Sequence, residues 1–215
     1  MAVAERRVAR LHLRASSEAL ARSGAARIED ALRTASLPDA GARLWLVRRL
    51  DLGRVPADAG SARLAHALER AFAAARAGAV YALEPGAAAA PVVWFRSGFE
   101  AHVALSRRLL GGPPPLEWFW PRAVRGWRPG AVEDGLREVV RALSALPEAP
   151  AALAQWLRLL VDEGHGPSLA AALDTNRRRL ERAAAPPAKS PGRRPRAIVG
   201  PTDAATWSWP TTSRP

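Results

Sequence analysis

Histidine spacing often reveals a metal site, and in this chain the spacing predicts none. The four histidines are His12, His66, His102 and His165, and no two of them lie four residues apart, as ligands on one helix face would. No carboxylate pair accompanies them at ligand spacing, and the chain has no cysteine. We therefore expect no metal ion, and the absence of cysteine also excludes disulfide bonds and thiol catalysis.

Candidates for nucleophilic and acid–base catalysis are equally few. Ser97 lies outside any Gly-x-Ser-x-Gly pattern, and a role as the cap of the following helix explains it better than a role as a nucleophile. The carboxylates of Glu29–Asp30 and Glu133–Asp134 are sequence neighbours, and adjacent side chains on a helix point about 100° apart. Neither pair can form a shared acid–base site. We expect no catalytic residue and no enzymatic activity.

Arginine carries nearly all of the positive charge. The chain has 32 lysine and arginine residues against 20 acidic residues, a net charge of +12, and Lys189 is its single lysine. Lys189 lacks the preceding glycines of a phosphate-binding loop, so we expect no nucleotide cofactor. The patch Arg177, Arg178 and Arg179, together with the tail that follows, could bind nucleic acid weakly and without sequence specificity. The other interpretation is a solvated tail that adds solubility.

Aromatic residues cluster in the segment Leu116–Trp127. Its aromatic members are Trp118, Phe119, Trp120 and Trp127. If exposed, they form a partner-binding patch, because tryptophan and arginine dominate interface hot spots. If buried, they pack the short helices against the rest of the protein. Both uses can coexist where the cluster reaches the rim of the core.

The first part of the chain is predicted to alternate strands and helices. Residues Val8–Leu13 alternate apolar and polar side chains, which is typical of a half-buried strand. Ser16 or Ser17 is placed to cap the helix that follows. A second strand is predicted over Leu44–Leu52, and a helix over residues 58–83.

The remainder of the chain is predicted to be mainly helical. Val92–Phe95 forms either a strand or the start of a helix, and Ser97 caps the next helix. The predicted helices are Gly98–Leu110, Val132–Leu146, Ala151–Asp162 and Ser168–Arg182. The fold class is therefore α+β and mainly helical: a small β-α-β-α N-terminal unit, then short helices, then a disordered basic tail.

Composition divides the chain into three parts. Residues 1–84 form the β-α-β-α unit, residues 85–182 a helical region with the tryptophan-rich segment, and residues 183–215 a disordered tail rich in proline and arginine. Residues 84–91 look like the linker between the first two parts. No run of about 18 apolar residues and no signal sequence is apparent, so we expect a cytoplasmic protein without a membrane span.

The passage from the second predicted strand into its helix resembles the N-terminal module of tape-measure-type proteins of contractile injection systems, the phage-tail-like particles of some bacteria. The matching positions are Leu50, Asp51, Leu52, Gly53, Pro56, Ala57 and Asp58. A second match is Leu109–Pro121, where a glycine follows a leucine-rich helix and an aromatic–proline run comes next. The resemblance covers residues 5–125.

The resemblance implies a non-enzymatic structural or assembly role in a phage-tail-like contractile injection particle. The implied partners are other particle proteins (tube, baseplate or cap), and the implied location is the cytoplasm or an exported particle. Members of that family are longer and carry repeated helical segments downstream, so the resemblance does not extend to length measurement. The alternative function is a basic protein that binds anions or nucleic acid through its arginine-rich C-terminal region. The sequence does not define an oligomeric state.

Overall fold

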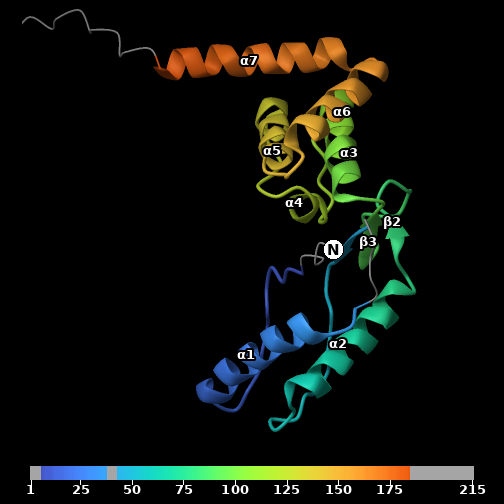
Figure 1. The fold of residues 1–215 in the computed structure, drawn as a ribbon, viewed down its shortest axis with the longest axis vertical. Helices are drawn as coiled ribbons and strands as arrows, with labels where there is room; N and C mark the ends of the chain where they lie inside the picture. The colour runs from blue at the N-terminus through green and yellow to red at the C-terminus, as the bar shows by residue number, and fades with distance from the viewer. Residues whose placement is uncertain (1–5, 38–42, 185–215) are drawn as a thin grey trace, which may run out of the picture.

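Helices surround a small sheet in the computed structural model, which describes residues 6–37 and 43–184, without the side chains of residues 176–184. The elements, in chain order, are α1 (Glu18–Thr34), β1 (Leu44–Val47), α2 (Ser61–Arg76), β2 (Val80–Tyr81), β3 (Val92–Phe95), α3 (Gly98–Gly111), α4 (Trp120–Ala123), α5 (Val132–Ser144), α6 (Ala149–Asp162) and α7 (Gly166–Ala184). In Figure 1, α1 and α2 lie at one end, the sheet in the middle, and α3 to α6 beyond it. The expected mainly helical α+β class is confirmed. Within the described ranges, no helix is long and apolar enough to cross a membrane.

The sheet joins strands that are far apart in sequence. Its strand order is β1-β3-β2, with β1 antiparallel and β2 parallel to β3. Leu46 and Val80 both lie opposite Val93, and this row belongs to the core formed with α3 and α4. The neighbouring row therefore points away from that core, since side chains alternate along a strand.

The expected boundary between residues 1–84 and 85–182 falls inside this sheet, because β1 and β2 pair with β3 across it. The segment interpreted as a linker, residues 84–91, forms a series of turns rather than a free connection. Ala87 and Ala90 within it are buried in the main core. The small alanine side chains let these turns lie close against the core.

Serine side chains begin two of the helices as predicted. The Leu20 N–H donates to Ser17 Oγ at 3.3 Å at the start of α1. The Glu100 N–H donates to Ser97 Oγ at 3.0 Å at the start of α3. Each serine has extended backbone and satisfies one of the N–H groups that a helix leaves free at its first turn. Ser97 is therefore a helix cap.

The predicted strand Val8–Leu13 is absent, and that prediction is wrong. These residues have no strand assignment and pair with no other strand. Val8, Leu11 and Leu13 are 50%, 45% and 40% exposed. An alternating pattern specifies which face of a strand is apolar, but a strand exists only where a second strand takes up its backbone hydrogen bonds. In the described part of the chain, no such strand lies beside this segment.

Two other elements are shorter than predicted. The strand predicted over Leu44–Leu52 ends at Val47, because β3 offers partners only as far as Pro91, whose carbonyl accepts the Arg48 N–H at 2.9 Å. The helix predicted over residues 58–83 spans Ser61–Arg76 instead. It ends early because the chain turns back after it to form β2, which pairs with β3.

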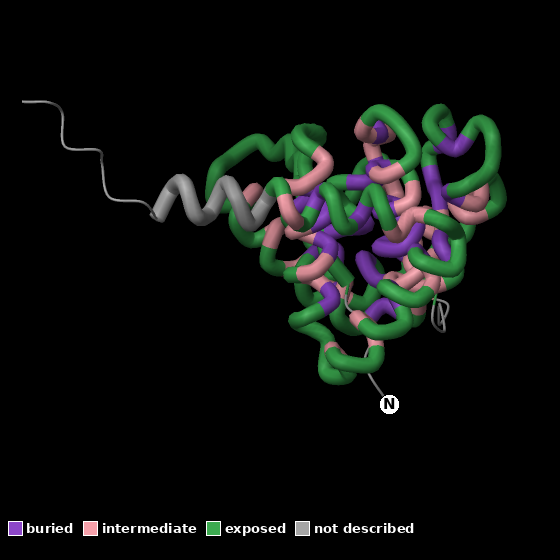
Figure 2. The backbone as a smooth tube through the Cα atoms, turned by 90° about the horizontal axis from the view of Figure 1, so that it is seen from above, coloured by how far each residue is buried: buried purple, intermediate pink, exposed green. Residues whose placement is uncertain are grey.

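Buried residues form two clusters. The larger cluster combines the inner face of the sheet with α3 to α7, and the smaller one lies between α1 and α2. Leu50 and Leu52, beyond the end of β1, pack against the smaller cluster. Arg27 of α1 donates to the carbonyls of Ala57 and Ala59 at 2.6 and 3.1 Å, which fixes the chain where it enters α2. Figure 2 shows the buried backbone positions inside a largely exposed outer surface.

Candidate functional site

The structure places most of the tryptophan-rich segment in the core. Phe119, Trp120 and Trp127 are 1%, 2% and 1% exposed. Phe119 and Trp120 pack on Phe95 of β3, with ring centroids 6.0 and 5.5 Å apart. Their side chains therefore join the helices to the sheet, as in the packing interpretation, and are not available to a partner. Trp118 is the member of the predicted set that stays partly exposed.

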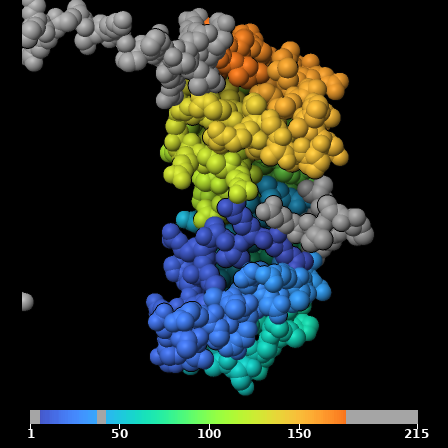
Figure 3. All heavy atoms as spheres, turned by 60° about the vertical axis from the view of Figure 1, so that its left-hand side comes forward, coloured from blue at the N-terminus to red at the C-terminus, as the bar shows by residue number. Residues whose placement is uncertain are grey.

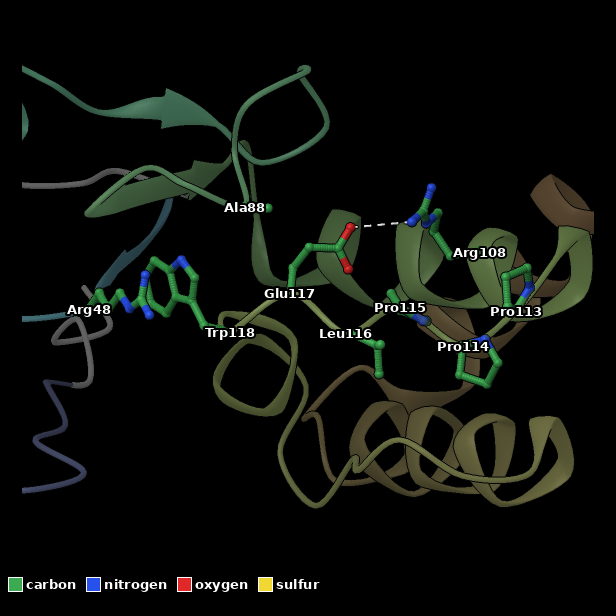
Figure 4. Close-up of a pocket in the computed structure, with 9 residues that line it drawn as sticks. All are labelled: Arg48, Ala88, Arg108, Pro113, Pro114, Pro115, Leu116, Glu117 and Trp118. Atoms are coloured by element: carbon green, nitrogen blue, oxygen red, sulfur yellow. Dashed lines mark hydrogen bonds and ion pairs between the residues drawn. The ribbon is translucent and has the colours of Figure 1, made fainter.

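Trp118 lines an open groove of about 520 Å³. The groove is formed by Arg48, Ala88, Arg108, Pro113, Pro114, Pro115, Leu116, Glu117 and Trp118. Figure 4 shows the three prolines and Leu116 along one side, with Trp118 and Arg48 at the other end. Arg48 comes from the end of β1 and Arg108 from α3, so the groove lies where the sheet meets the helical part.

The wall of the groove is rigid because it is built from consecutive prolines. Residues 113–115 have fixed φ angles and no backbone N–H donors. Leu116, which follows them, is 81% exposed, the highest value among the exposed large apolar side chains of the described residues. A rigid segment holds this leucine in an exposed position. Little further conformational entropy is therefore lost when a partner binds its apolar side chain.

The floor of the groove contains an organised ion pair. Arg108 Nη2 lies 3.2 Å from Glu117 Oε1, drawn as a dashed line in Figure 4, and the Trp120 indole N–H donates to Glu117 Oε2 at 3.1 Å. A second cavity of about 360 Å³ adjoins the first and shares Arg108, Glu117 and Ala88 with it. Glu117 is thus held in place by two donors.

Trp118 forms the aromatic rim of the groove, and Arg122 packs on its ring. The Arg122 guanidinium carbon lies 5.8 Å from the Trp118 ring centroid, and Arg122 also donates to the Trp118 carbonyl at 2.9 Å. The Trp118 indole nitrogen is shielded from solvent and has no hydrogen-bond partner among the described residues.

A second aromatic surface lies on the outer face of the sheet and was not predicted. Trp45, Trp94 and Tyr81 occupy one row across β1, β3 and β2, with ring centroids 6.1 and 5.0 Å apart. An arginine guanidinium stacks over each ring. Had Val92–Phe95 been assigned as a strand, its alternation would have placed Trp94 on the opposite face from Val93 and Phe95. The pairing itself has no signal in the sequence.

Tyr81 is tied into this row by its hydroxyl, which donates to Glu100 Oε1 at 2.5 Å. Burial raises the pKa of Tyr81, and the hydrogen bond to the Glu100 carboxylate raises it further. The Tyr81 hydroxyl therefore stays protonated and neutral at ordinary pH, and the charge beside the rings comes from the stacked arginines. Because each ring is covered by its own guanidinium, the row serves mainly to seal the outer face of the sheet.

The other predicted binding residues, Arg177, Arg178 and Arg179, lie in α7, but their side chains are outside the described part. The expected tail begins at residue 183, whereas α7 continues to Ala184, and residues 185–215 are not described. Across residues 6–37 and 43–175, whose side chains the structure describes, no group of three or more His, Asp or Glu residues is arranged to hold a metal ion.

Comparison with known proteins returned no matching family model, no matching curated protein and no matching solved structure. The functional argument therefore depends on the residues and geometry of this chain.

Proposed function

We propose that this protein is a non-enzymatic structural or assembly component of a phage-tail-like contractile injection particle. The observation that carries the proposal is the resemblance at Leu50–Asp58. In the fold, this passage leads from the sheet to α2: Gly53 has φ of 65° and Pro56 follows it. Glycine adopts that backbone readily, and Pro56 begins a turn in which its carbonyl accepts the Ala59 N–H at 3.0 Å, so the motif shapes the connection that precedes α2.

The groove beside Trp118 is the surface through which the protein would hold a neighbouring particle protein. It combines a rigid proline wall, an exposed leucine and an aromatic rim with the guanidiniums of Arg48 and Arg122 nearby. Tryptophan and arginine are the residues enriched in interface hot spots, and the groove presents Trp118 together with Arg48. The complementary partner is a segment with an apolar side chain for Leu116 and carboxylates for the arginines.

Gene position and co-purification test the proposal. The gene is expected to lie among genes for sheath, tube and baseplate proteins, and the full chain is expected to co-purify with at least one of them after co-expression. Leu116→Ser is expected to weaken that capture at least tenfold. Leu146→Ser is the control, because Leu146 is also exposed (40%) but does not line the groove.

Two results would overturn the proposal. A gene neighbourhood without any particle genes would remove the particle assignment. Capture that is equal for Leu116→Ser and the wild-type chain would remove the groove from the interface, even if the particle assignment stood.

The alternative, binding of anions or nucleic acid through the arginine-rich C-terminal region, concerns side chains outside the described part. Filter binding of nucleic acid over a salt series tests it, because phosphate contacts give affinity that falls with salt. Equal affinity after deletion of residues 183–215, or no salt dependence, would exclude it.

A further inference from the structure

The aromatic row on the outer face of the sheet lies where that face is accessible. Trp45, Trp94 and Tyr81 are each partly exposed, whereas Val92, two residues along β3 on the same face, is 0% exposed. Phe72 of α2 meets Trp45 edge-on, with ring centroids 6.3 Å apart, so α2 borders the row beside β1. Figure 3 shows the region of the sheet between the two-helix end, in blue, and the later helices, in yellow and orange.

A row of guanidiniums accompanies the row of rings. The guanidinium carbon atoms of Arg76, Arg43 and Arg96 lie 4.9, 4.8 and 5.3 Å from the ring centroids of Trp45, Trp94 and Tyr81, in that order. Arg43 directly precedes β1 and Arg96 directly follows β3, so the β1–β3 register, continued by one residue, sets Arg43 opposite Arg96. Like charges directly opposite each other on neighbouring strands are destabilising. An anion between the two guanidiniums would relieve that repulsion.

Carboxylates of the described residues neutralise little of this charge. Neither Arg43 nor Arg76 forms an ion pair with a described carboxylate. Arg96 Nε lies 3.8 Å from Glu100 Oε1, but this oxygen also accepts from the Tyr81 hydroxyl at 2.5 Å, and Glu100 Oε2 accepts the Arg96 backbone N–H at 2.6 Å. Arg43 is exposed, and the Arg96 side chain is 75% exposed. Both guanidiniums are therefore accessible to an anion from solution.

We propose that this row binds single-stranded nucleic acid. The guanidiniums of Arg43 and Arg96 contact phosphates, and bases stack on the rings of Trp94 and Tyr81. In the free protein the guanidiniums cover the rings, and on binding they turn to the phosphates while bases take their places. A guanidinium–ring contact at an exposed site contributes less than the stacking of a base on an aromatic side chain, so this exchange favours the complex. The inference is independent of the particle assignment, of the groove and of the C-terminal arginines.

The surface fits a nucleic-acid strand because it combines positive charge with a row of rings. The guanidiniums complement phosphates, and the net charge of +12 adds long-range attraction for a polyanion. The rings offer flat apolar faces, which a base uses and the carboxylates of an acidic peptide do not. A duplex keeps its base faces inside its own stack, so the strand must be single. Every base has a flat face, so we expect little sequence preference.

Fluorescence anisotropy of a labelled oligothymidylate, titrated with the full chain, measures the binding. The comparison strand has the same length and the same phosphates but carries no bases. We expect the strand without bases to bind at least tenfold more weakly at the same salt concentration, because it cannot stack on the rings.

Removal of the two exposed guanidiniums tests the assignment to the sheet. Arg43→Gln combined with Arg96→Gln is expected to weaken binding of the oligothymidylate at least tenfold. The slope of log affinity against log salt concentration should also fall by about 1.4, since each phosphate contact on a single strand contributes about 0.7. Arg63→Gln combined with Arg158→Gln is the matched control: both arginines are exposed, one in the first turn of α2 and one in α6. We expect the control to change affinity less than twofold.

Replacement of the middle ring separates stacking from charge. Trp94→Leu is expected to weaken binding at least tenfold while the salt slope stays unchanged, because no cation is lost. Trp118→Leu is the control, since Trp118 lines the groove rather than the sheet row. Circular dichroism checks that both variants fold, and the arginine variants test the inference without disturbing the core, because their side chains are exposed.

Either of two outcomes would overturn the inference. The first is equal affinity of the wild-type chain and the Arg43→Gln, Arg96→Gln chain for the oligothymidylate, which would place any binding elsewhere, as in the C-terminal region. The second is equal affinity for the strands with and without bases, which would make the arginines a simple anion site.

Discussion

Ser106 joins α3 to α6 through a buried hydrogen bond, and removing its hydroxyl should be costly. Ser106 is 0% exposed and Trp156 is 4% exposed. The Trp156 indole N–H donates to Ser106 Oγ at 2.9 Å, and Ser106 Oγ–H donates to the His102 carbonyl at 2.9 Å. Ser106→Ala leaves the indole N–H buried without an acceptor. A buried unsatisfied donor costs about 1–3 kcal/mol, so we expect a loss of about 2 kcal/mol in the free energy of unfolding.

The assay is urea unfolding followed by far-ultraviolet circular dichroism, with the slope of the transition checked for constancy. Ser144→Ala is the matched control: Ser144 is exposed at the end of α5, and its loss should change stability by less than about 0.5 kcal/mol. A double-mutant cycle with Trp156→Phe should give a coupling of about 1 kcal/mol or more. If Ser106→Ala unfolds like the wild type, or the two changes add without coupling, the buried hydrogen bond does not stabilise the packing of α3 on α6.

Two further predictions concern the same core. Gly135→Ala should lower the melting temperature, because the added Cβ would lie 2.7 Å from Leu109 Cδ1. Overpacking costs about 1–3 kcal/mol, which outweighs the gain in helix propensity of about 1 kcal/mol. Gly98→Ala is the control, because an added Cβ there meets open space. Burial lowers the pKa of His102, so the fold favours the neutral ring. Stability should fall as pH drops through about 6.5, where the unfolded chain binds a proton, and His102→Gln should remove this component in urea titrations.

Features fixed by local chemistry could be predicted from the sequence. Ser17 and Ser97 cap their helices because a serine side chain reaches the N–H groups of the next turn without help from distant residues. The helices α5 and α6 begin and end within a few residues of the predicted bounds, since their apolar stripes are set by residues three and four apart. Such signals do not depend on the rest of the fold.

Features that depend on distant residues could not be predicted. The row Trp45–Trp94–Tyr81 exists because β3 lies between β1 and β2, and no local pattern encodes that order. The groove combines Arg48 with residues 108–118, which the fold alone brings together. For the tryptophan-rich segment, composition allowed both burial and exposure. The contacts of Phe119 and Trp120 with Phe95 show that these two are buried, and of the four aromatic residues Trp118 remains at the rim.

The segment Val8–Leu13 shows how a correct pattern can lead to a wrong element. Alternation reports which side chains could share an apolar face, and Leu11 and Leu13 do share one, but hydrogen bonding requires a second strand. Residues 49–53 show the same limit: Leu50 and Leu52 are half-buried against the α1–α2 cluster, but the strand has already ended at Val47 and Gly53 has φ of 65°. In both segments the alternation specifies which side chains share a face, whereas a strand also needs a hydrogen-bonded neighbour, and only the fold supplies that neighbour.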